Sequence, residues 1–198
     1  MDRTLDDGLA AVSVARRAAD GEESRWLDAA RRGDELAFER LVAAWESTIY
    51  NLCLRMLGDK ELAADATQEA FLNAYKGMRR FRGGARFSSW VYRIASNVCL
   101  TRLRAAPRNL ERVHPSAEPV DERGGPEERL RDEERRHRVR SALGTLRPDH
   151  RIVVELKVYQ ELTFDRIAVL IDVPESTVKA RFYAALQTLR HRLVADEA

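Results

Sequence analysis

The sequence contains few cysteines and no long apolar run. Its two cysteines, Cys53 and Cys99, are too few for a disulfide scaffold and lack the spacing of metal ligands. We therefore expect reduced, buried thiols in a cytoplasmic protein. No segment approaches the roughly 20 apolar residues needed to span a bilayer, and segment 1–20 lacks the apolar core of a secretion signal. We expect neither secretion nor membrane insertion.

Residue patterns that support catalysis or metal binding are also missing. The four histidines are scattered along the chain, and no nucleophile stands in a pattern with a base or with paired carboxylates. Gly83 and Gly84 lack the companion residues of a phosphate-binding loop. We therefore predict no enzyme activity, no catalytic residue, no bound metal and no cofactor.

Acidic residues are absent from two stretches of this nearly neutral chain. The net charge is only +2, yet segments 76–108 and 176–195 contain basic residues and no Asp or Glu, whereas acids outnumber bases in segment 20–75. Solvated helix faces normally mix both signs. The segregation therefore favours two separate contacts with a polyanion over two ordinary solvated faces.

Apolar residues recur with a helical period along most of the 198 residues. The 44% hydrophobic content excludes general disorder, and the length allows one large domain or two small ones. Gly58 and Asp59 predict a helix stop, and Ser88 or Ser89 is a candidate helix cap. The periodicity predicts helices, and no strands, at about 24–57 with a break at 32–34, then 61–78, 88–104, 127–146, 149–159, 163–171 and 175–194.

A segment rich in proline and glycine divides these helices into two groups. Residues 106–127 contain four prolines and a Gly-Gly pair, which is typical of a linker. The predicted fold is therefore all-α, with two small helical domains joined by a flexible linker. The predicted boundaries are a flexible extension at 1–23, a first domain at 24–105, the linker at 106–127 and a second domain at 128–198.

The second domain contains the pattern of a helix-turn-helix in residues 163–190. Two predicted helices are joined by a short turn that contains Pro174, and the second helix is basic. We expect Ile167, Leu170 and Ile171 to pack on Val178, Leu186 and Leu189, and Ser176 or Thr177 to cap the second helix. This pattern, together with the basic charge, favours binding of duplex DNA over a plain helical hairpin.

The first basic stretch interleaves arginines with aromatic residues. Phe81, Phe87, Trp90 and Tyr92 lie among arginines in the sequence RRFRGGARFSSWVYR. Aromatic rings stack on unpaired bases and arginines bind the backbone, which is the chemistry of single-strand binding. The alternative is that rings such as Phe81 and Trp90 are core residues, because buried aromatics are common.

Two segments resemble a known family. LGDKELAADATQEAFLNAYKGMRRFRGGARFSSWVYRIASNVCLTRLR resembles the second conserved region of bacterial RNA polymerase sigma factors, of the extracytoplasmic-function (ECF, group IV) type of the sigma-70 family. LRPDHRIVVELKVYQELTFDRIAVLIDVPESTVKARF resembles the fourth region of that family. The resemblance covers about residues 24–104 and 128–194, and the order and spacing of the two regions agree with it.

The resemblance implies a role for each segment. It implies binding to the clamp helices of the largest subunit of core RNA polymerase by Asp65, Gln68, Glu69 and Leu72. It implies recognition and melting of the minus-ten promoter element by Arg80, Phe81, Arg82, Arg86, Phe87, Ser88, Trp90, Arg93, Asn97 and Arg104. It implies recognition of the minus-thirty-five element by Ser176, Thr177, Lys179, Ala180, Arg181, Tyr183 and Arg190. It also implies regulation by an anti-sigma factor, and promoter choice without covalent chemistry.

Some positions depart from the family pattern. Ala180, Ala184 and Leu186 stand where the family usually has serine and arginines, and Asp172 stands where it usually has glycine. The contact with the minus-thirty-five element is therefore either weak or adapted to an unusual sequence.

Two other functions use similar features. A transcriptional regulator could use the helix-turn-helix on duplex DNA without being a polymerase subunit, but it usually carries a sensor domain with strands, which the pattern does not predict. An anti-sigma antagonist usually has a membrane span or a cluster of histidine and cysteine, and neither is present.

Overall fold

The computed structural model describes residues 21–81, 86–105, 138–139 and 141–195. All regular elements in these residues are helices, which confirms the predicted all-α fold class. Residues 1–20 of the predicted extension, the whole predicted linker and the predicted helix start near residue 127 lie outside the described residues.

Four helical segments form the N-terminal part of the structure. Residues 21–31 are helical, and they are followed by α2 (Glu35–Leu57), α3 (Lys60–Gly77) and α4 (Phe87–Ala105). The Asp34 carboxylate accepts a hydrogen bond from the Ala37 amide at 3.0 Å, which caps the N-terminus of α2. Gly58 ends α2 with a positive φ of 74°, a conformation that glycine adopts without steric cost. The stop predicted at residues 58 and 59 is confirmed.

The start of α4 differs from the prediction. The helix begins at Phe87, so Ser88 and Ser89 lie inside its first turn and neither is the cap. The Trp90 amide donates to the Arg86 carbonyl at 3.2 Å, which closes this first turn. Phe87 is fully buried, and packing of its ring favours extending the helix by one residue.

The C-terminal part contains shorter helices. Residues 141–144 are helical, and α6 (Pro148–Val154), η2 (Glu155–Tyr159), α7 (Phe164–Ile171) and α8 (Glu175–Ala195) follow. The helix predicted at 149–159 is present, but its second part, η2, is a π-helical turn in which the Gln160 amide donates to the Glu155 carbonyl. Such a widened turn often marks a functional position.

The helix-turn-helix consists of α7 and α8. Asp172 ends α7 in the left-handed region with φ 56°, and the Pro174 carbonyl accepts hydrogen bonds from the first turn of α8. Ser176 and Thr177 therefore lie inside α8 and do not cap it. Ile167, Leu170 and Val178 are buried as predicted, whereas Leu186 is 40% exposed, so its predicted place in the core is wrong.

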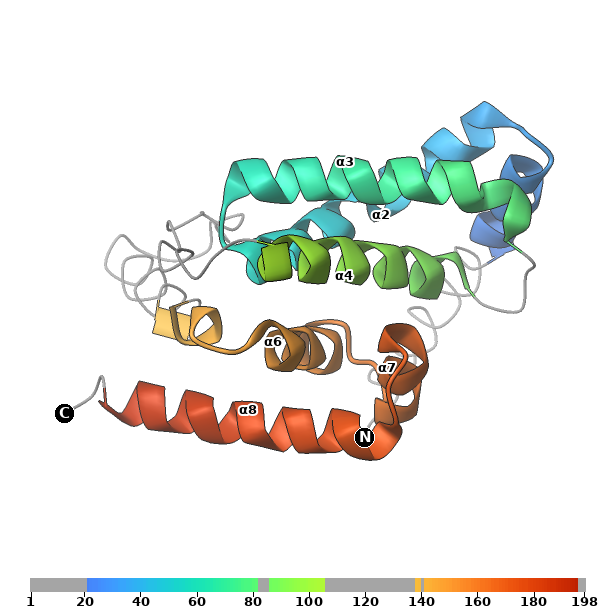
Figure 1. Cartoon of the computed structure of the whole chain (residues 1–198). Coiled ribbons are helices and arrows are strands. Elements are labelled where there is room, and N and C mark those ends of the chain that lie inside the picture. Colours follow the sequence, from blue (N-terminus) through green and yellow to red (C-terminus); the bar gives the residue numbers. More distant parts are fainter. Residues whose placement is uncertain (1–20, 82–85, 106–137, 140, 196–198) are drawn as a thin grey trace, which may run out of the picture.

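One apolar core continues through both parts of the structure. The N-terminal helices α2, α3 and α4 pack together as a three-helix bundle, and α6, α7 and α8 lie beside it with α4 facing α6 (Figure 1). Ile152, Leu156 and Ile167 belong to the same buried cluster as Leu41 and Val91. The two predicted domains are therefore packed against each other, and a second, smaller cluster around Leu146 and Ala185 is confined to the C-terminal part.

Candidate functional site

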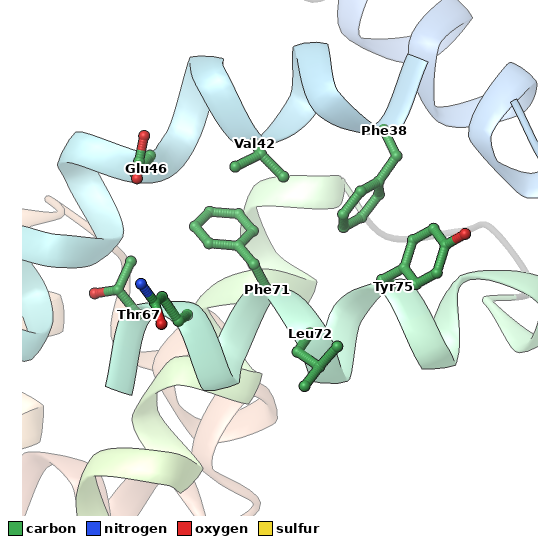
Figure 2. A pocket seen from close by; sticks show the side chains of 8 residues that line it. Phe38, Val42, Glu46, Thr67, Phe71, Leu72 and Tyr75 are labelled. Carbon is green, nitrogen blue, oxygen red and sulfur yellow. The ribbon is translucent and has the colours of Figure 1, made fainter. Parts of the chain in front are cut away.

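An apolar groove lies between α2 and α3. It encloses about 340 Å³ and is open to solvent. Leu72 is 52% exposed and Tyr75 46% exposed, which is unusual for large apolar side chains at neighbouring positions of one helix. The residues that line the groove are Phe38, Val42, Glu46, Thr67, Gln68, Phe71, Leu72 and Tyr75 (Figure 2).

The side chains predicted for polymerase binding lie beside this groove. Asp65, Gln68, Glu69 and Leu72 are all exposed on α3, and their spacing places them on one helix face. The structure therefore brings together all four members of this predicted set. Gln68 and Leu72 also line the groove, so the polar and apolar parts of the surface are continuous.

Two interactions fix the ends of this surface. Glu69 accepts hydrogen bonds from Arg102 of α4 at 2.6 and 3.2 Å. The Tyr75 hydroxyl donates to the Glu35 carboxylate at 3.0 Å, and this bond raises the pKa of Tyr75. Sequence reasoning missed Phe38, Val42 and Tyr75 as residues that line the groove. The available signal was an apolar side chain at both 72 and 75, one turn apart on an otherwise polar helix face.

A second candidate surface is basic and lies on η1 (Met78–Arg80) and α4. Arg93, Asn97 and Arg104 are exposed along α4, and Arg80 is exposed at the end of η1. Among the described residues, no ion pair involves Arg80, Arg93 or Arg104. Arg86 is also exposed, and the predicted contact residue Arg82 lies outside the described residues.

The aromatic residues of this segment form a packed cluster. Phe87 is 0% exposed and Phe81 is 8% exposed. The half-buried Trp90 ring lies 4.7 Å from the Phe81 ring and 6.1 Å from the Phe87 ring, measured between centroids. Base stacking requires a free ring face. Phe81 and Phe87 therefore contribute to the core in this structure, as the alternative reading of the sequence allowed, and a contact of either ring with a base stays a prediction.

Trp90 and Ser88 remain partly accessible. A Cβ atom at Gly77 would lie 3.0 Å from the Trp90 ring, so the indole packs closely against the end of α3. This packing fixes the orientation of Trp90 at the boundary between the core and the basic surface. Ser88 is half-buried in the first turn of α4.

A third candidate surface lies along α8, mostly in its N-terminal half. Ser176, Ala180, Tyr183 and Arg190 are exposed, and Thr177 is half-buried. Lys179 forms an ion pair with Glu175 at 2.7 Å, and this interaction raises the pKa of Lys179. The Arg181 guanidinium lies 3.6 Å from Asp149 of α6.

The acids on this third surface were not part of the sequence-based prediction. Glu175 directly precedes the acid-free stretch, and Asp149 is distant in sequence, so charge counting within residues 176–195 excluded both. Their ion pairs partly neutralise the two central cations of the predicted contact set. Arg190 has no ion pair among the described residues.

The family models of two conserved regions match this chain. The model of Sigma-70 region 2 matches residues 41–109, and that of Sigma-70 region 4 matches residues 136–189. The ECF RNA polymerase sigma factor SigW of Bacillus subtilis is 31% identical over 172 residues, which cover 82% of this chain and 92% of SigW. The chain belongs to the sigma-70 family, in its ECF group.

Other similar proteins agree with the assignment of this chain to the ECF sigma factors. The ECF RNA polymerase sigma-E factor of Escherichia coli K12 is 29% identical over 181 residues, covering 84% of this chain and 92% of that protein. Among solved structures, CnrH in complex with the cytosolic domain of CnrY superposes with a TM-score of 0.67, 21% identity and coverage of 88% of this chain and 99% of CnrH. This likeness agrees with the fold.

The sigma factor is a transcription initiation factor, as predicted from the resemblance. We call the helices α2–α4 region 2 and the helices α6–α8 region 4. In the part of the chain that the structure describes, no helix combines the length and apolarity needed to cross a membrane. The same residues contain no group of three or more histidine, cysteine, aspartate or glutamate side chains arranged to bind a metal ion.

Proposed function

We propose that this sigma factor binds core RNA polymerase through α3, melts the minus-ten element on α4 and contacts the minus-thirty-five element with α8. The observation that supports this proposal most directly is the separation of surfaces within region 2. The groove lies between α2 and α3, whereas the exposed Arg93 and Arg104 lie on α4, so one module presents surfaces on different helices that suit two partners.

The α3 surface is suited to a helical protein partner. Leu72 and Tyr75 present apolar area at the groove, and Asp65 and Glu69 add negative charge beside it. An apolar centre with a charged rim is typical of protein interfaces, and its charge would select a basic partner. The clamp helices of the largest polymerase subunit are the partner that the family resemblance implies.

The α4 surface is suited to a separated DNA strand. Arg93 and Arg104 supply positive charge along one face of α4, Asn97 adds a hydrogen-bonding group between them, and Arg80 adds a further exposed cation at the end of η1. Phosphate binding by arginine gives affinity that depends on salt. We assign Trp90, whose ring is the partly accessible one, to the edge of the melted bases.

The α8 surface is suited to the major groove of duplex DNA. Ser176, Ala180 and Tyr183 are exposed early in the second helix of a helix-turn-helix, where base edges are read. Lys179 and Arg190 would contact phosphates. The ion pairs of Lys179 and Arg181 support a weak minus-thirty-five contact, one of the two alternatives raised by the departures from the family pattern.

Regulation, location and chemistry complete the proposal. One solved structure with the same fold is the sigma factor RpoE in complex with the anti-sigma factor NepR from Bartonella quintana, with a TM-score of 0.61, 17% identity and coverage of 80% of this chain and 98% of that chain. We propose that an anti-sigma factor likewise binds this chain. We also propose that this chain acts in the cytoplasm and catalyses no covalent reaction.

The test is run-off transcription with purified core polymerase. We expect the full chain to give promoter-specific transcripts, and Leu72→Asp to abolish binding to core by placing a charge at the groove. Arg80→Ala should instead reduce open-complex formation more than core binding. A chain that forms no complex with core at low salt would refute the proposal. Duplex binding with no effect on core polymerase would favour the regulator that acts without polymerase.

A further inference from the structure

One face of α8 points directly away from the core. Val178 and Ala185, which are seven residues apart, are fully buried and mark the face that packs inward. The exposed residues that follow one another at intervals of three or four on the opposite face are Ser176, Ala180, Tyr183, Gln187 and Arg190. Because this spacing keeps side chains on one side of a helix, the five residues form a single stripe, which we call the α8 stripe.

The part of the α8 stripe nearest the turn of the helix-turn-helix is mostly apolar. Tyr183 is 59% exposed and Ala180 is also exposed, so a ring and a methyl group lie one turn apart. Arg190 lies further along the axis, by about 15 Å from Ala180 at about 1.5 Å per residue. The N-terminal residues of the second helix are the ones that contact base edges in a helix-turn-helix. The base-reading positions therefore offer apolar surface and the hydroxyl of Ser176.

The cations beside this part of the stripe are held by other groups. Lys179 pairs with Glu175 at 2.7 Å, and its ammonium lies 6.0 Å from the centre of the Phe164 ring of α7. The half-buried Arg181 lies 3.6 Å from Asp149. A bidentate contact from arginine or lysine is the commonest way to recognise guanine. Residues 175–183, all of which the structure describes, therefore contain no unpaired cation with which to read guanine.

The Tyr183 ring is held in place by neighbouring rings. Its centroid lies 5.7 Å from that of Phe182, and the Phe182 centroid lies 5.4 Å from that of Phe164, both in edge geometry. Phe182 is half-buried and packs against both apolar clusters. A ring that is already fixed loses little freedom on binding. Tyr183 is therefore pre-organised as a contact surface.

We propose that α8 reads thymine in the minus-thirty-five element through apolar contact of Ala180 and Tyr183 with the C5-methyl group, and that it reads no guanine there. Among the four bases, only thymine presents a methyl group in the major groove, and apolar side chains recognise it. This inference rests on the proposed function for the assignment of α8 to that element. The paired cations leave the electrostatic affinity weak, while the methyl contact supplies the choice of sequence.

The test removes only methyl groups from the DNA. Duplexes of random sequence are selected for binding to holoenzyme made from the full chain and purified core polymerase. Each thymine of the selected duplexes is then replaced by deoxyuridine, which lacks the C5-methyl group and keeps the hydrogen-bonding groups. We expect deoxyuridine at one or more positions to lower affinity about fourfold, the effect of leaving one methyl group unburied.

Variants assign this effect to α8. In Tyr183→Ala and in Ala180→Ser, the deoxyuridine effect at the contacted thymine should fall from about fourfold to less than about twofold. Val169→Ser removes an apolar side chain that is 76% exposed on α7, and it should leave the effect unchanged. Each ratio compares two duplexes on the same protein, so a general loss of affinity or stability cancels. Tyr183→Arg should change the selected base from thymine to guanine, because an exposed guanidinium can contact guanine O6 and N7.

The outcomes are separate from those for the proposed function. Deoxyuridine that binds as well as thymine at every position, with a holoenzyme that transcribes from specific promoters, would overturn the thymine contact and leave the proposed function intact. An effect that stays fourfold in both Tyr183→Ala and Ala180→Ser would also overturn it. A chain that forms no complex with core polymerase would instead refute the proposed function, and the same duplexes measured with the chain alone would still decide whether α8 reads the methyl group.

Discussion

Regions 2 and 4 differ in whether their exposed basic residues form ion pairs. Arg80, Arg93 and Arg104 of region 2 have no ion pair among the described residues, whereas Lys179 and Arg181 of region 4 pair with Glu175 and Asp149. A cation that already has an anionic partner gains less from a phosphate. We therefore expect region 2 to supply more of the electrostatic attraction to DNA than region 4.

The two regions also differ in how they are stabilised. Region 2 packs long helices of 23, 18 and 19 residues around many fully buried side chains. Region 4 has shorter helices, and part of its apolar surface is covered by α2 and α4. Small helical units have little core of their own. Region 4 therefore depends on region 2 for part of its burial.

The largest expected effect is on the free energy of unfolding, and it tests whether region 4 depends on the core that it shares with region 2. Leu156 is fully buried in the shared core, so Leu156→Ala should lower the free energy of unfolding by about 2–5 kcal/mol. Leu186→Ala, at an exposed leucine of α8, should change it by about 0.5 kcal/mol or less. Urea unfolding monitored by circular dichroism measures both. Equal effects would show that region 4 does not share the core.

A smaller effect separates two buried hydroxyls of region 2. The Thr67 hydroxyl donates to the Ala63 carbonyl at 2.7 Å, whereas the buried Ser96 hydroxyl has no partner among the described residues. Thr67→Val should therefore destabilise the protein by about 1 kcal/mol, while Ser96→Ala should stabilise it by up to about 1 kcal/mol. Urea unfolding of both variants beside the unaltered chain is the measurement. Loss of stability in Ser96→Ala would show that the hydroxyl has a partner.

The electrostatic comparison predicts different salt dependences. Arg93→Ala should reduce the slope of log affinity against log salt by about 0.7 for a forked minus-ten DNA bound by holoenzyme. This corresponds to about threefold in affinity between 50 and 200 mM salt. Lys179→Ala should reduce the slope for minus-thirty-five duplex by less, because Glu175 already pairs with this lysine. Fluorescence anisotropy titrations at several salt concentrations compare the two, and equal reductions would contradict the difference between regions.

The smallest expected effect comes from a substitution that leaves a region 4 cation without an ion pair, as Arg93 of region 2 is among the described residues. Glu175→Gln removes the anionic partner of Lys179 and should raise affinity for minus-thirty-five duplex by about twofold. Glu39→Gln, at an exposed position of α2, is the matched control and should have no effect. Both are measured with the same duplex at low salt. A lower affinity in Glu175→Gln would mean that Glu175 orients Lys179 rather than neutralising it.

Local patterns in the sequence were sufficient for much of the fold. The period of apolar residues predicted the existence of α2, α3, α4, α7 and α8, and Gly58 marked the end of α2. The caps predicted for α4 and α8 lie two or three residues after the positions that precede these helices. The position of a cap depends on which residue joins the helix by packing in the core, as the buried Phe87 does at the start of α4. Several serines near a helix start are also equally plausible caps, so the sequence alone does not choose between them.

The candidate surfaces were predicted unevenly. Asp65, Gln68, Glu69 and Leu72 share a helix face, so their spacing alone brought them together. The aromatic residues did not follow from spacing, because a ring beside arginines can face either the core or solvent, and Phe81 and Phe87 face the core. The acids that pair with Lys179 and Arg181 were missed because one of them lies on another helix.

The sequence by itself determined the all-helical fold, the family and the segregation of charge, because each of these depends on residues close together along the chain. Only the tertiary structure decided that regions 2 and 4 share a core and that Arg55 meets Glu155, a hundred residues away. Such a contact depends on the packing of whole helices and on the π-helical turn, which no local pattern encodes. It is this packing, rather than the motifs, that sets where α4 and α8 lie relative to each other, through the contacts that α7 makes with both.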